Sequence, residues 1–362
     1  MQRWIVKIGS NSLTDGSGRF ARRKVEALVR DIAALRAGGI DVVLVSSAAI
    51  ALGRETLGWL DRTLTIPEKQ AAAAVGQVRL MEHYRQAAER HGLLVAQLLL
   101  SRDDLDVRER YLHTRSTAEM LLEHGVLPVV NENDTVAVDE IRFGDNDTLA
   151  ALVAIALEAQ KLVLLTDIDG LYDADPRKVP TAQKIDRVPV WDDALFALAG
   201  GAGSAVGSGG MRTKLQAAKL AAHSGIEVVI ARAEPDVLQA LSRGEMRGTV
   251  FDPKRHYRGK KRWLASAARA NGSLYVDEGA KAALVKGGGS LLLPGIIRVE
   301  GAFLEHQTVA VLGPKGEEIG RGIVRFSASD LRLLLMRRAQ GETLRGIGEV
   351  IHRDDFVVTA PV

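Results

Sequence analysis

The chain alternates between short apolar runs and longer amphipathic segments. The apolar runs are rich in β-branched residues and leucine, and they lie at 3–8, 41–45, 94–100, 126–130, 161–166 and 227–231. Between them, segments with helical periodicity include 22–37, 67–91, 107–123 and 148–157. Strands that alternate with helices of this length predict an α/β domain, in which helices cover both faces of an open, mainly parallel sheet.

The pattern changes after about Phe251. A basic stretch follows, and from Gly272 the sequence becomes glycine-rich, with short strand candidates at 290–293, 296–299, 308–312, 319–324 and 350–352. Strands of this length and spacing are typical of a small, mainly β domain. We therefore expect a catalytic domain at 1–252, a basic linker at 253–271 and a second domain at 272–362.

The composition narrows the classes of protein. The chain has 362 residues, of which 46% are apolar, and no cysteine, so disulfides, thiol catalysis and cysteine-zinc sites are excluded. No apolar run is long enough to cross a bilayer, and the N-terminus begins a strand without the design of a signal peptide. We expect a cytoplasmic protein without a membrane partner. The net charge of +3 is too small to indicate nucleic acid by itself.

Two clusters of carboxylates and amides bracket one loop. Asn131, Glu132, Asn133 and Asp134 follow the apolar run at 126–130, and Asp145, Asn146 and Asp147 precede the helical segment at 148–157. In open α/β sheets, ligands bind at the carboxyl ends of the strands. The alternative is a turn at the first cluster and an N-cap at the second. The density of polar groups in both clusters favours a site for a small polar molecule that carries an ammonium group.

Other strand ends carry similar groups. Lys7 lies near the end of the first strand, Ser47 follows the second, and Thr166-Asp167 closes the strand at 161–166. Asp169-Gly170, just beyond, is equally consistent with an ordinary turn. We expect these strand ends to meet at one edge of the sheet.

A glycine-rich loop, VGSGGMRTKLQ at 206–216, precedes an alanine-rich helical segment. Arg212 and Lys214 fall in the first helical turn, where the helix dipole disfavours cations, and a bound anion would remove that conflict. The loop is not a Walker A motif. With Lys7, these residues favour phosphoryl transfer from a nucleotide to a small acidic acceptor. A carboxylate acceptor is already ionised and needs no general base.

Nine motifs, in order along the chain, match one family. They are VKIGSNSLT (6–14), VSSAAIALGR (45–54), AAVGQ (73–77), RERYLHTR (108–115), PVVNENDTVA (128–137), FGDNDTLAAL (143–152), LLTDIDGLYDADPR (164–177), GSGGMRTKLQAA (207–218) and KKRWL (260–264). The chain resembles the amino-acid kinase family, in its glutamate 5-kinase branch with a C-terminal PUA domain. The resemblance spans essentially the whole chain.

The resemblance implies a role for each matching residue. Lys7 and Lys214 are expected to be catalytic, with Asp147 orienting a lysine. The implied ATP site comprises Lys7, Thr166, Asp167, Ser208, Gly209, Gly210, Met211, Arg212, Thr213 and Lys214. The implied glutamate site comprises Ser47, Asp134 and Asn146, with Asn131 and Asp145 close by. Mg²⁺ is expected with ATP, and the residues that would bind the metal are not identified.

The implied reaction converts ATP and L-glutamate into ADP and L-glutamate 5-phosphate, the first step towards proline. The resemblance also implies feedback inhibition by proline and a homo-oligomer, either a dimer or a tetramer. An acyl phosphate hydrolyses readily, so transient contact with glutamate-5-phosphate reductase is expected.

One residue departs from the family pattern. Ala48 stands where the family usually has glycine. If the backbone there has a positive φ, alanine costs about 1 kcal/mol; if it does not, the methyl group only narrows the pocket.

Two alternatives remain. The first is a related kinase that acts on acetylglutamate, aspartate, carbamate or a nucleoside monophosphate; the two polar clusters and the C-terminal domain argue against it. The second is an RNA-binding PUA protein with a regulatory kinase-like domain, which the basic stretch at 254–262 favours. Aromatic residues for base stacking make up only 4% of the chain, so RNA is not expected to be the main partner.

Overall fold

The computed structural model divides into two compact units, Met1–Arg255 and His256–Val362. The structure describes residues 2–136, 146–176, 178–189, 191, 194–198, 210–254, 259–266, 268–342 and 346–359. No helix in these ranges combines the length and the apolar character needed to cross a membrane.

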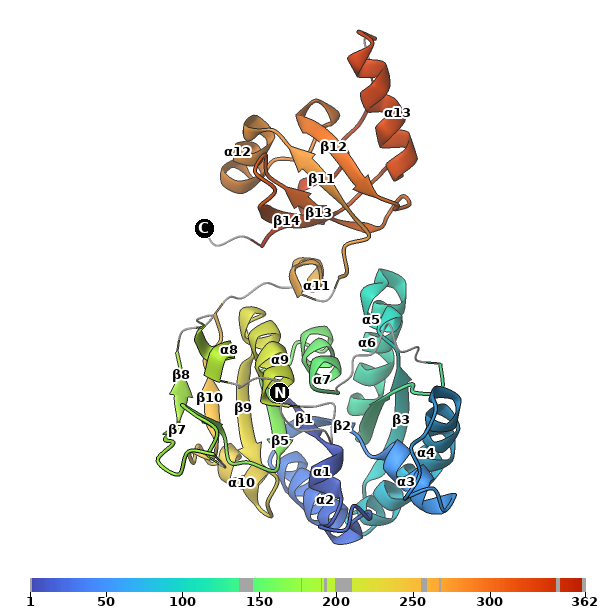
Figure 1. Cartoon of the computed structure of the whole chain (residues 1–362), viewed down its shortest axis with the longest axis vertical. Coiled ribbons are helices and arrows are strands. Elements are labelled where there is room, and N and C mark those ends of the chain that lie inside the picture. The colour runs from blue at the N-terminus through green and yellow to red at the C-terminus, as the bar shows by residue number, and fades with distance from the viewer. Residues whose placement is uncertain are drawn as a thin grey trace. The chain divides into compact units, whose positions relative to one another are not determined.

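The first unit is built on an eight-stranded sheet in the order β3-β4-β2-β1-β5-β9-β10-β8 (Figure 1). Every neighbouring pair is parallel except β9 and β10, which are antiparallel. The strands are β1 (Gln2–Ile8), β2 (Ile40–Ser46), β3 (Leu94–Leu100), β4 (Val126–Glu132), β5 (Lys161–Thr166), β8 (Arg187–Val188), β9 (Glu227–Arg232) and β10 (Thr249–Phe251). The predicted open, mainly parallel sheet is confirmed.

Helices cover both faces of this sheet (Figure 1). On one face lie α2 (Arg22–Ala37), α3 (Ala49–Thr56), α4 (Ile66–Glu89) and α10 (Val237–Ser242), and on the other lie α6 (Arg108–Glu123), α7 (Asn146–Ala156) and α9 (Met211–His223). The unit is completed by α1 (Ser10–Leu13), α5 (Asp103–Asp106), α8 (Ala194–Leu198) and a small hairpin of β6 (Leu171–Tyr172) and β7 (Lys184–Ile185).

Alternation along the strands assigns their side chains to the two faces. Trp4, Val6 and Ile8 of β1 belong to the apolar core shared with α2 and α4. Lys7 therefore points to the opposite face, where α7 packs against β1. The register aligns Ile8 with Ser46 and Val45 with Val130, so the residues after β1, β2 and β4 emerge along one edge of the sheet.

The second unit contains a five-stranded sheet in the order β12-β11-β13-β14-β15, in which only β11 and β13 are parallel. Its strands are β11 (Gly272–Val276), β12 (Ile296–Gly301), β13 (Thr308–Leu312), β14 (Glu318–Ile323) and β15 (Phe356–Val358). Its helices are α11 (Gly259–Ser266), α12 (Glu278–Gly287) and α13 (Ala328–Ala339), with short 3-10 turns η2 (Leu293–Gly295) and η3 (Arg353–Asp355).

Two strand predictions in this unit are wrong. The segments predicted at 290–293 and 350–352 contribute only an isolated bridge between Leu291 and Ile351, and 3-10 turns follow each of them. Most of their apolar residues are buried in the core of the unit, which is why the pattern resembled strands; these are Leu291, Leu293, Val350 and Ile351, whereas Leu292 is exposed. Part of the basic stretch, which the sequence suggested as linker, forms α11. This helix buries Trp263 and Leu264 and packs on β14 and β15.

Candidate active site

A buried carboxylate joins two lysines from distant parts of the chain. Asp147 lies in the first turn of α7, Lys7 in β1 and Lys214 in the first turn of α9. Lys7 Nζ is 2.5 Å from Asp147 Oδ1, and Lys214 Nζ is 3.1 Å from Asp147 Oδ2. Asp147 is 0% exposed and both lysines are buried. A buried charge requires close partners, and these three groups supply them for one another.

Among the described side chains of this cluster, positive charge exceeds negative charge. Two ammonium groups share one carboxylate, and the N-termini of α7 and α9 add partial positive charge from their free N–H groups. Thr213 Oγ1 donates to Gly210 O over 2.7 Å and lies 3.3 Å from Asp147 Oδ2, which fixes the start of α9 beside the carboxylate. Asp147 supplies part of the negative charge that Lys214 requires at a helix N-terminus. The remaining positive charge suits a phosphoryl group.

Asn146 connects two strand ends beside this cluster. Its Nδ2 lies 3.0 Å from Ser46 O, 2.8 Å from Ser47 Oγ and 2.9 Å from Asn131 Oδ1. Asn131 Oδ1 also accepts from Glu132 N over 2.9 Å. One residue of each sequence cluster, Asn131 and Asn146, therefore meets the other at the end of β2, where Asn146 also contacts Ser47. Ser46 was not identified from the sequence, although a serine at the end of a buried strand was the available signal.

Each of these two asparagines also has one side-chain polar atom without a hydrogen-bond partner among the described residues. These atoms are Asn131 Nδ2 and Asn146 Oδ1, and both are buried. Buried polar atoms are usually paired, and unpaired ones call for an explanation. A free donor and a free acceptor at a strand-end site fit a small ligand with both carboxylate and ammonium groups.

Ala48 takes the left-handed conformation, with φ 82° and ψ 7°, directly before α3. Of the two alternatives that the sequence left open, the backbone therefore shows the positive φ that strains alanine. Its side chain is 5% exposed and belongs to the apolar core cluster of this unit. The methyl group therefore packs into the protein interior.

Thr166 ends β5, the strand next to β1, and Asp167 follows it. Thr166 is buried, and its Oγ1 donates to Asp167 Oδ1 over 3.0 Å. The Asp169-Gly170 turn beyond them is attached to the sheet through Thr249. The hydroxyl of Thr249 accepts from Leu171 N over 2.8 Å and donates to Ile185 O over 2.5 Å.

The structure places the remaining candidates unequally. Asp134 is half-buried in the turn directly after β4. Gly210 is the N-cap of α9, Met211 begins the helix, and Arg212 is exposed. The candidates that lie outside the described residues are Asp145, Ser208 and Gly209.

Two glycines allow α3 and α4 to touch next to the site. A Cβ atom on Gly76 would lie 1.7 Å from Ala49 O, and one on Gly53 would lie 1.7 Å from Ala72 O. The helices therefore cross with backbone against backbone, which only glycine permits. This contact gives a physical reason for the glycines in the motifs at 45–54 and 73–77, and it fixes α3 immediately after Ser47 and Ala48.

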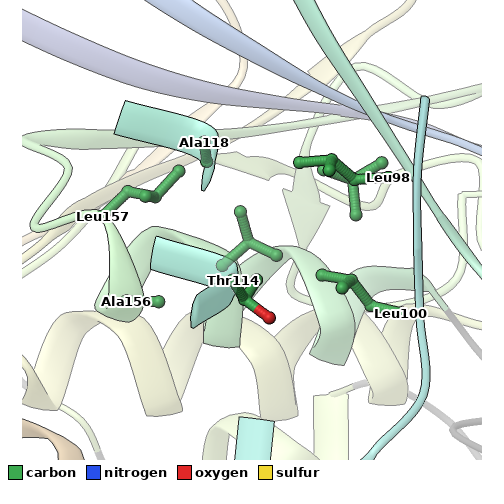
Figure 2. Close-up of a pocket in the computed structure, with 8 residues that line it drawn as sticks. Leu98, Leu100, Thr114, Ala118, Ala156 and Leu157 are labelled. Carbon is green, nitrogen blue, oxygen red and sulfur yellow. The ribbon is translucent and has the colours of Figure 1, made fainter. Parts of the chain in front are cut away.

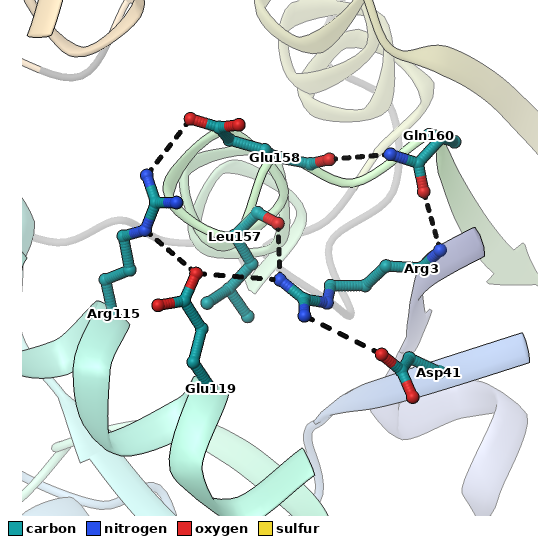
Figure 3. A network of polar contacts seen from close by, with 7 residues as sticks. All are labelled: Arg3, Asp41, Arg115, Glu119, Leu157, Glu158 and Gln160. Atoms are coloured by element: carbon teal, nitrogen blue, oxygen red, sulfur yellow. Dashed lines mark hydrogen bonds and ion pairs between the residues drawn. The ribbon is translucent and has the colours of Figure 1, made fainter. Parts of the chain in front are cut away.

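A polar network anchors the opposite end of α7 (Figure 3). Arg3 Nη1 donates to Leu157 O over 2.8 Å, and Arg3 Nη2 lies 3.6 Å from Asp41 Oδ2. Arg115 Nε lies 2.9 Å from Glu119 Oε1, and Arg115 Nη1 lies 3.0 Å from Glu158 Oε1. Cations near a helix C-terminus are favourable because they interact with its exposed carbonyl groups. Strand β1 thus holds α7 at both ends, through Arg3 at one end and Lys7 at the other.

A small cavity between α6, α7 and the sheet is entirely apolar (Figure 2). It is lined by Leu98, Leu100, Thr114, Ala118, Val130, Val153, Ala156 and Leu157. A charged substrate would lose its hydration there without compensation, so this cavity is not the substrate site.

The described residues contain no group of three or more histidine, aspartate or glutamate side chains arranged to hold a metal ion. Asp147, the most buried carboxylate of the site, has both oxygens engaged by lysines. Mg²⁺ commonly retains water and binds through substrate phosphates with only one or two carboxylates.

Comparison with known proteins places this geometry in a class. A model of the amino acid kinase family matches residues 2–232, and a PUA domain model matches residues 272–341. A solved structure of isopentenyl phosphate kinase has a TM-score of 0.50 at 20% identity, covering 69% of this chain and 100% of that one, which shows the shared fold. The first unit is an amino acid kinase domain.

Closer relatives specify the branch. A glutamate 5-kinase from Carboxydothermus hydrogenoformans is 47% identical, over 99% of this chain and 98% of the relative. A glutamate 5-kinase from Stutzerimonas stutzeri is also 47% identical with the same coverage. The chain belongs to the glutamate 5-kinases of the amino acid kinase family, in the form that carries a PUA domain.

Proposed function

We propose that this enzyme transfers the γ-phosphoryl group of ATP to the side-chain carboxylate of L-glutamate, giving ADP and L-glutamate 5-phosphate, the first step of proline biosynthesis. The observation that carries the proposal is the Lys7–Asp147–Lys214 cluster. Asp147 of this cluster directly follows Asn146, whose side chain contacts Ser46 at the end of β2 and Asn131 in β4. The positively charged group that would bind phosphate and the polar groups that would bind a small molecule therefore lie side by side at the N-terminus of α7.

On the nucleotide side, Lys7 and Lys214 contact the ATP phosphates and stabilise charge on the transferring group. Thr166 and Asp167, with residues 210–214, line the ATP site. Ser208 and Gly209, which lie outside the described residues, are assigned to it from the sequence. Two lysines bridged by one carboxylate are held in fixed positions, so little reorganisation is needed as charge develops in the transition state. When present, Mg²⁺ would supply further charge neutralisation.

On the acceptor side, Ser47, Asp134 and Asn146 bind glutamate, with Asn131 close by. Asp145, which lies outside the described residues, is assigned to the same site from the sequence. The carboxylate of Asp134 suits the α-ammonium group, while the amide and hydroxyl groups suit carboxylate oxygens. The γ-carboxylate is already ionised near neutral pH and attacks phosphorus directly, so no side chain has to remove a proton. Asp147 acts by orienting the two lysines.

The likeness to this branch of the family supports further proposals about regulation, assembly and location. Proline, which shares an α-carboxylate and an ammonium group with glutamate, acts as a feedback inhibitor at or near the acceptor site. The enzyme works as a homo-oligomer, a dimer or a tetramer, in the cytoplasm, and its labile acyl phosphate passes to glutamate-5-phosphate reductase.

An acceptor panel tests the proposed function. The purified enzyme with Mg²⁺ and ATP is given L-glutamate, N-acetylglutamate, aspartate or carbamate, and ADP release is measured for each. We expect turnover with glutamate far above that with the others. A preference for another acceptor would keep the fold and reject the substrate. Lys214→Ala should lower kcat strongly with little change in the glutamate KM; an effect on that KM alone would reject the role of the lysine.

A further inference from the structure

Two buried hydroxyl groups lie behind the proposed glutamate site, on the face of the sheet away from α7. Ser46 ends β2, Tyr84 lies in α4, and both are 0% exposed. Tyr84 Oη and Ser46 Oγ are 2.7 Å apart, and Ser46 Oγ lies 3.1 Å from Ser47 O. The chain of contacts therefore runs from the core of the unit to the backbone of a residue proposed to bind glutamate.

The direction of these hydrogen bonds follows from the donors available. A carbonyl oxygen only accepts, so the hydroxyl hydrogen of Ser46 is donated to Ser47 O. Tyr84 must then donate to Ser46 Oγ. Burial raises the pKa of the Tyr84 phenol, which keeps the hydroxyl protonated and able to donate.

This arrangement fixes one peptide plane. In a trans peptide the C=O and N–H groups point in opposite directions. With Ser47 O turned toward Ser46 Oγ, the N–H of Ala48 is turned toward the α7 face, where Asn146 lies. Among the described residues, Ala48 N–H donates no hydrogen bond. The preceding carbonyl, Ser46 O, accepts from Asn146 Nδ2 on that face, so two successive peptides are held from opposite sides.

We propose that Tyr84 and Ser46 are positioning residues: their hydroxyl relay orients the Ser47–Ala48 peptide so that Ala48 N–H binds an oxygen of the acceptor substrate. The inference rests on the proposed function and goes beyond it, because neither side chain reaches the substrate. A tyrosine that only filled the core would need no partner that leads to the site. Ala48, in its left-handed conformation, links this peptide to the start of α3.

A double-mutant cycle tests the relay. Tyr84→Phe and Ser46→Ala each remove one hydroxyl group with almost no change in volume. Each should raise the glutamate KM about three- to tenfold, the effect of one net hydrogen bond, while the ATP KM stays unchanged. Since both act through one chain, the double variant should match the single variants. Ser224→Ala is the control: Ser224 is also fully buried and donates to a backbone carbonyl, Leu220 O, but lies after α9. It should leave both KM values unchanged.

Each outcome has a defined meaning. An unchanged glutamate KM in both single variants, or effects that multiply in the double variant, would overturn the relay. Equal changes in the glutamate and ATP KM values would also overturn it, because they indicate a general loss of structure. A wild-type enzyme without glutamate turnover would reject the proposed function itself, and the relay with it.

Discussion

Replacing Ala48 with glycine should remove backbone strain at the start of α3. With φ 82°, Ala48 is in a region that costs an L-residue about 1–2 kcal/mol and that glycine adopts freely. Ala49, the next residue, offers a matched control. It is equally buried, and it is absent from the residues with positive φ.

The magnitude follows from three contributions. Either substitution loses a buried methyl group, worth about 0.8 kcal/mol. Either substitution also gives the unfolded chain more conformational freedom, which destabilises the fold by about 0.4–1 kcal/mol. Only Ala48→Gly gains about 1–2 kcal/mol from strain relief. We therefore expect Ala48→Gly to stay within about 1 kcal/mol of the wild type, and Ala49→Gly to be less stable than Ala48→Gly by about 1–2 kcal/mol.

Urea unfolding of the two variants measures this difference, and steady-state kinetics measures its effect on function. Because the Ala48 methyl group packs into the core and glycine gives the Ser47–Ala48 peptide more freedom, we expect Ala48→Gly not to lower the glutamate KM. Equal destabilisation by the two substitutions would refute the strain argument. A lower KM in Ala48→Gly would show that the methyl group restricts the substrate pocket.

Three further predictions concern charge and packing. Asp147→Asn leaves two buried lysines without their carboxylate and should cost about 3–5 kcal/mol of stability, with a large loss of kcat. A non-hydrolysable ATP analogue should recover part of the stability of this variant. An equal loss of stability with and without the analogue would contradict the charge argument. Gly76→Ala should lower the free energy of unfolding by about 3 kcal/mol or more, because the new Cβ atom meets a backbone oxygen. Gly16→Ala, where the Cβ atom would lie in open space, should leave it unchanged; thermal unfolding of both variants measures the difference. Burial raises the pKa of Asp31, so its contribution to stability is present at low pH and is lost as pH rises through the folded-state pKa. Asp31→Asn should therefore stabilise the fold at pH 7, with the gain vanishing below about pH 3, and a gain independent of pH would count against this.

The sheet was largely predictable because its strands carry a clear signal. The runs at 94–100 and 161–166 have the predicted bounds. The strand at 161–166 is almost entirely buried and therefore reads as a continuous apolar segment, whereas the edge strand at 94–100 is only partly buried but is still mostly apolar in sequence. The same signal failed at Leu291 and Ile351. Their side chains are buried in the second unit, but their backbones make only one bridge, and periodicity does not distinguish these cases.

The site was predictable as a set of strand ends but not as a set of contacts. The sequence indicated that Lys7, Lys214 and Asp147 would lie near one edge. It could not show that the carboxylate bridges both lysines, because that depends on how α7 and α9 pack. Ser46 and Tyr84 gave even less signal, since a serine and a tyrosine within apolar segments are common in cores.

The most direct test of the central claim is to trap the product. The enzyme is incubated with Mg²⁺, ATP, L-glutamate and hydroxylamine, and the hydroxamate is identified by mass spectrometry, with Lys214→Ala in parallel. We predict γ-glutamyl hydroxamate from the wild type, only when both ATP and glutamate are present, and a large reduction in the variant. ATP consumption without γ-glutamyl hydroxamate, or equal product from the Lys214→Ala variant, would contradict phosphoryl transfer to glutamate at this site.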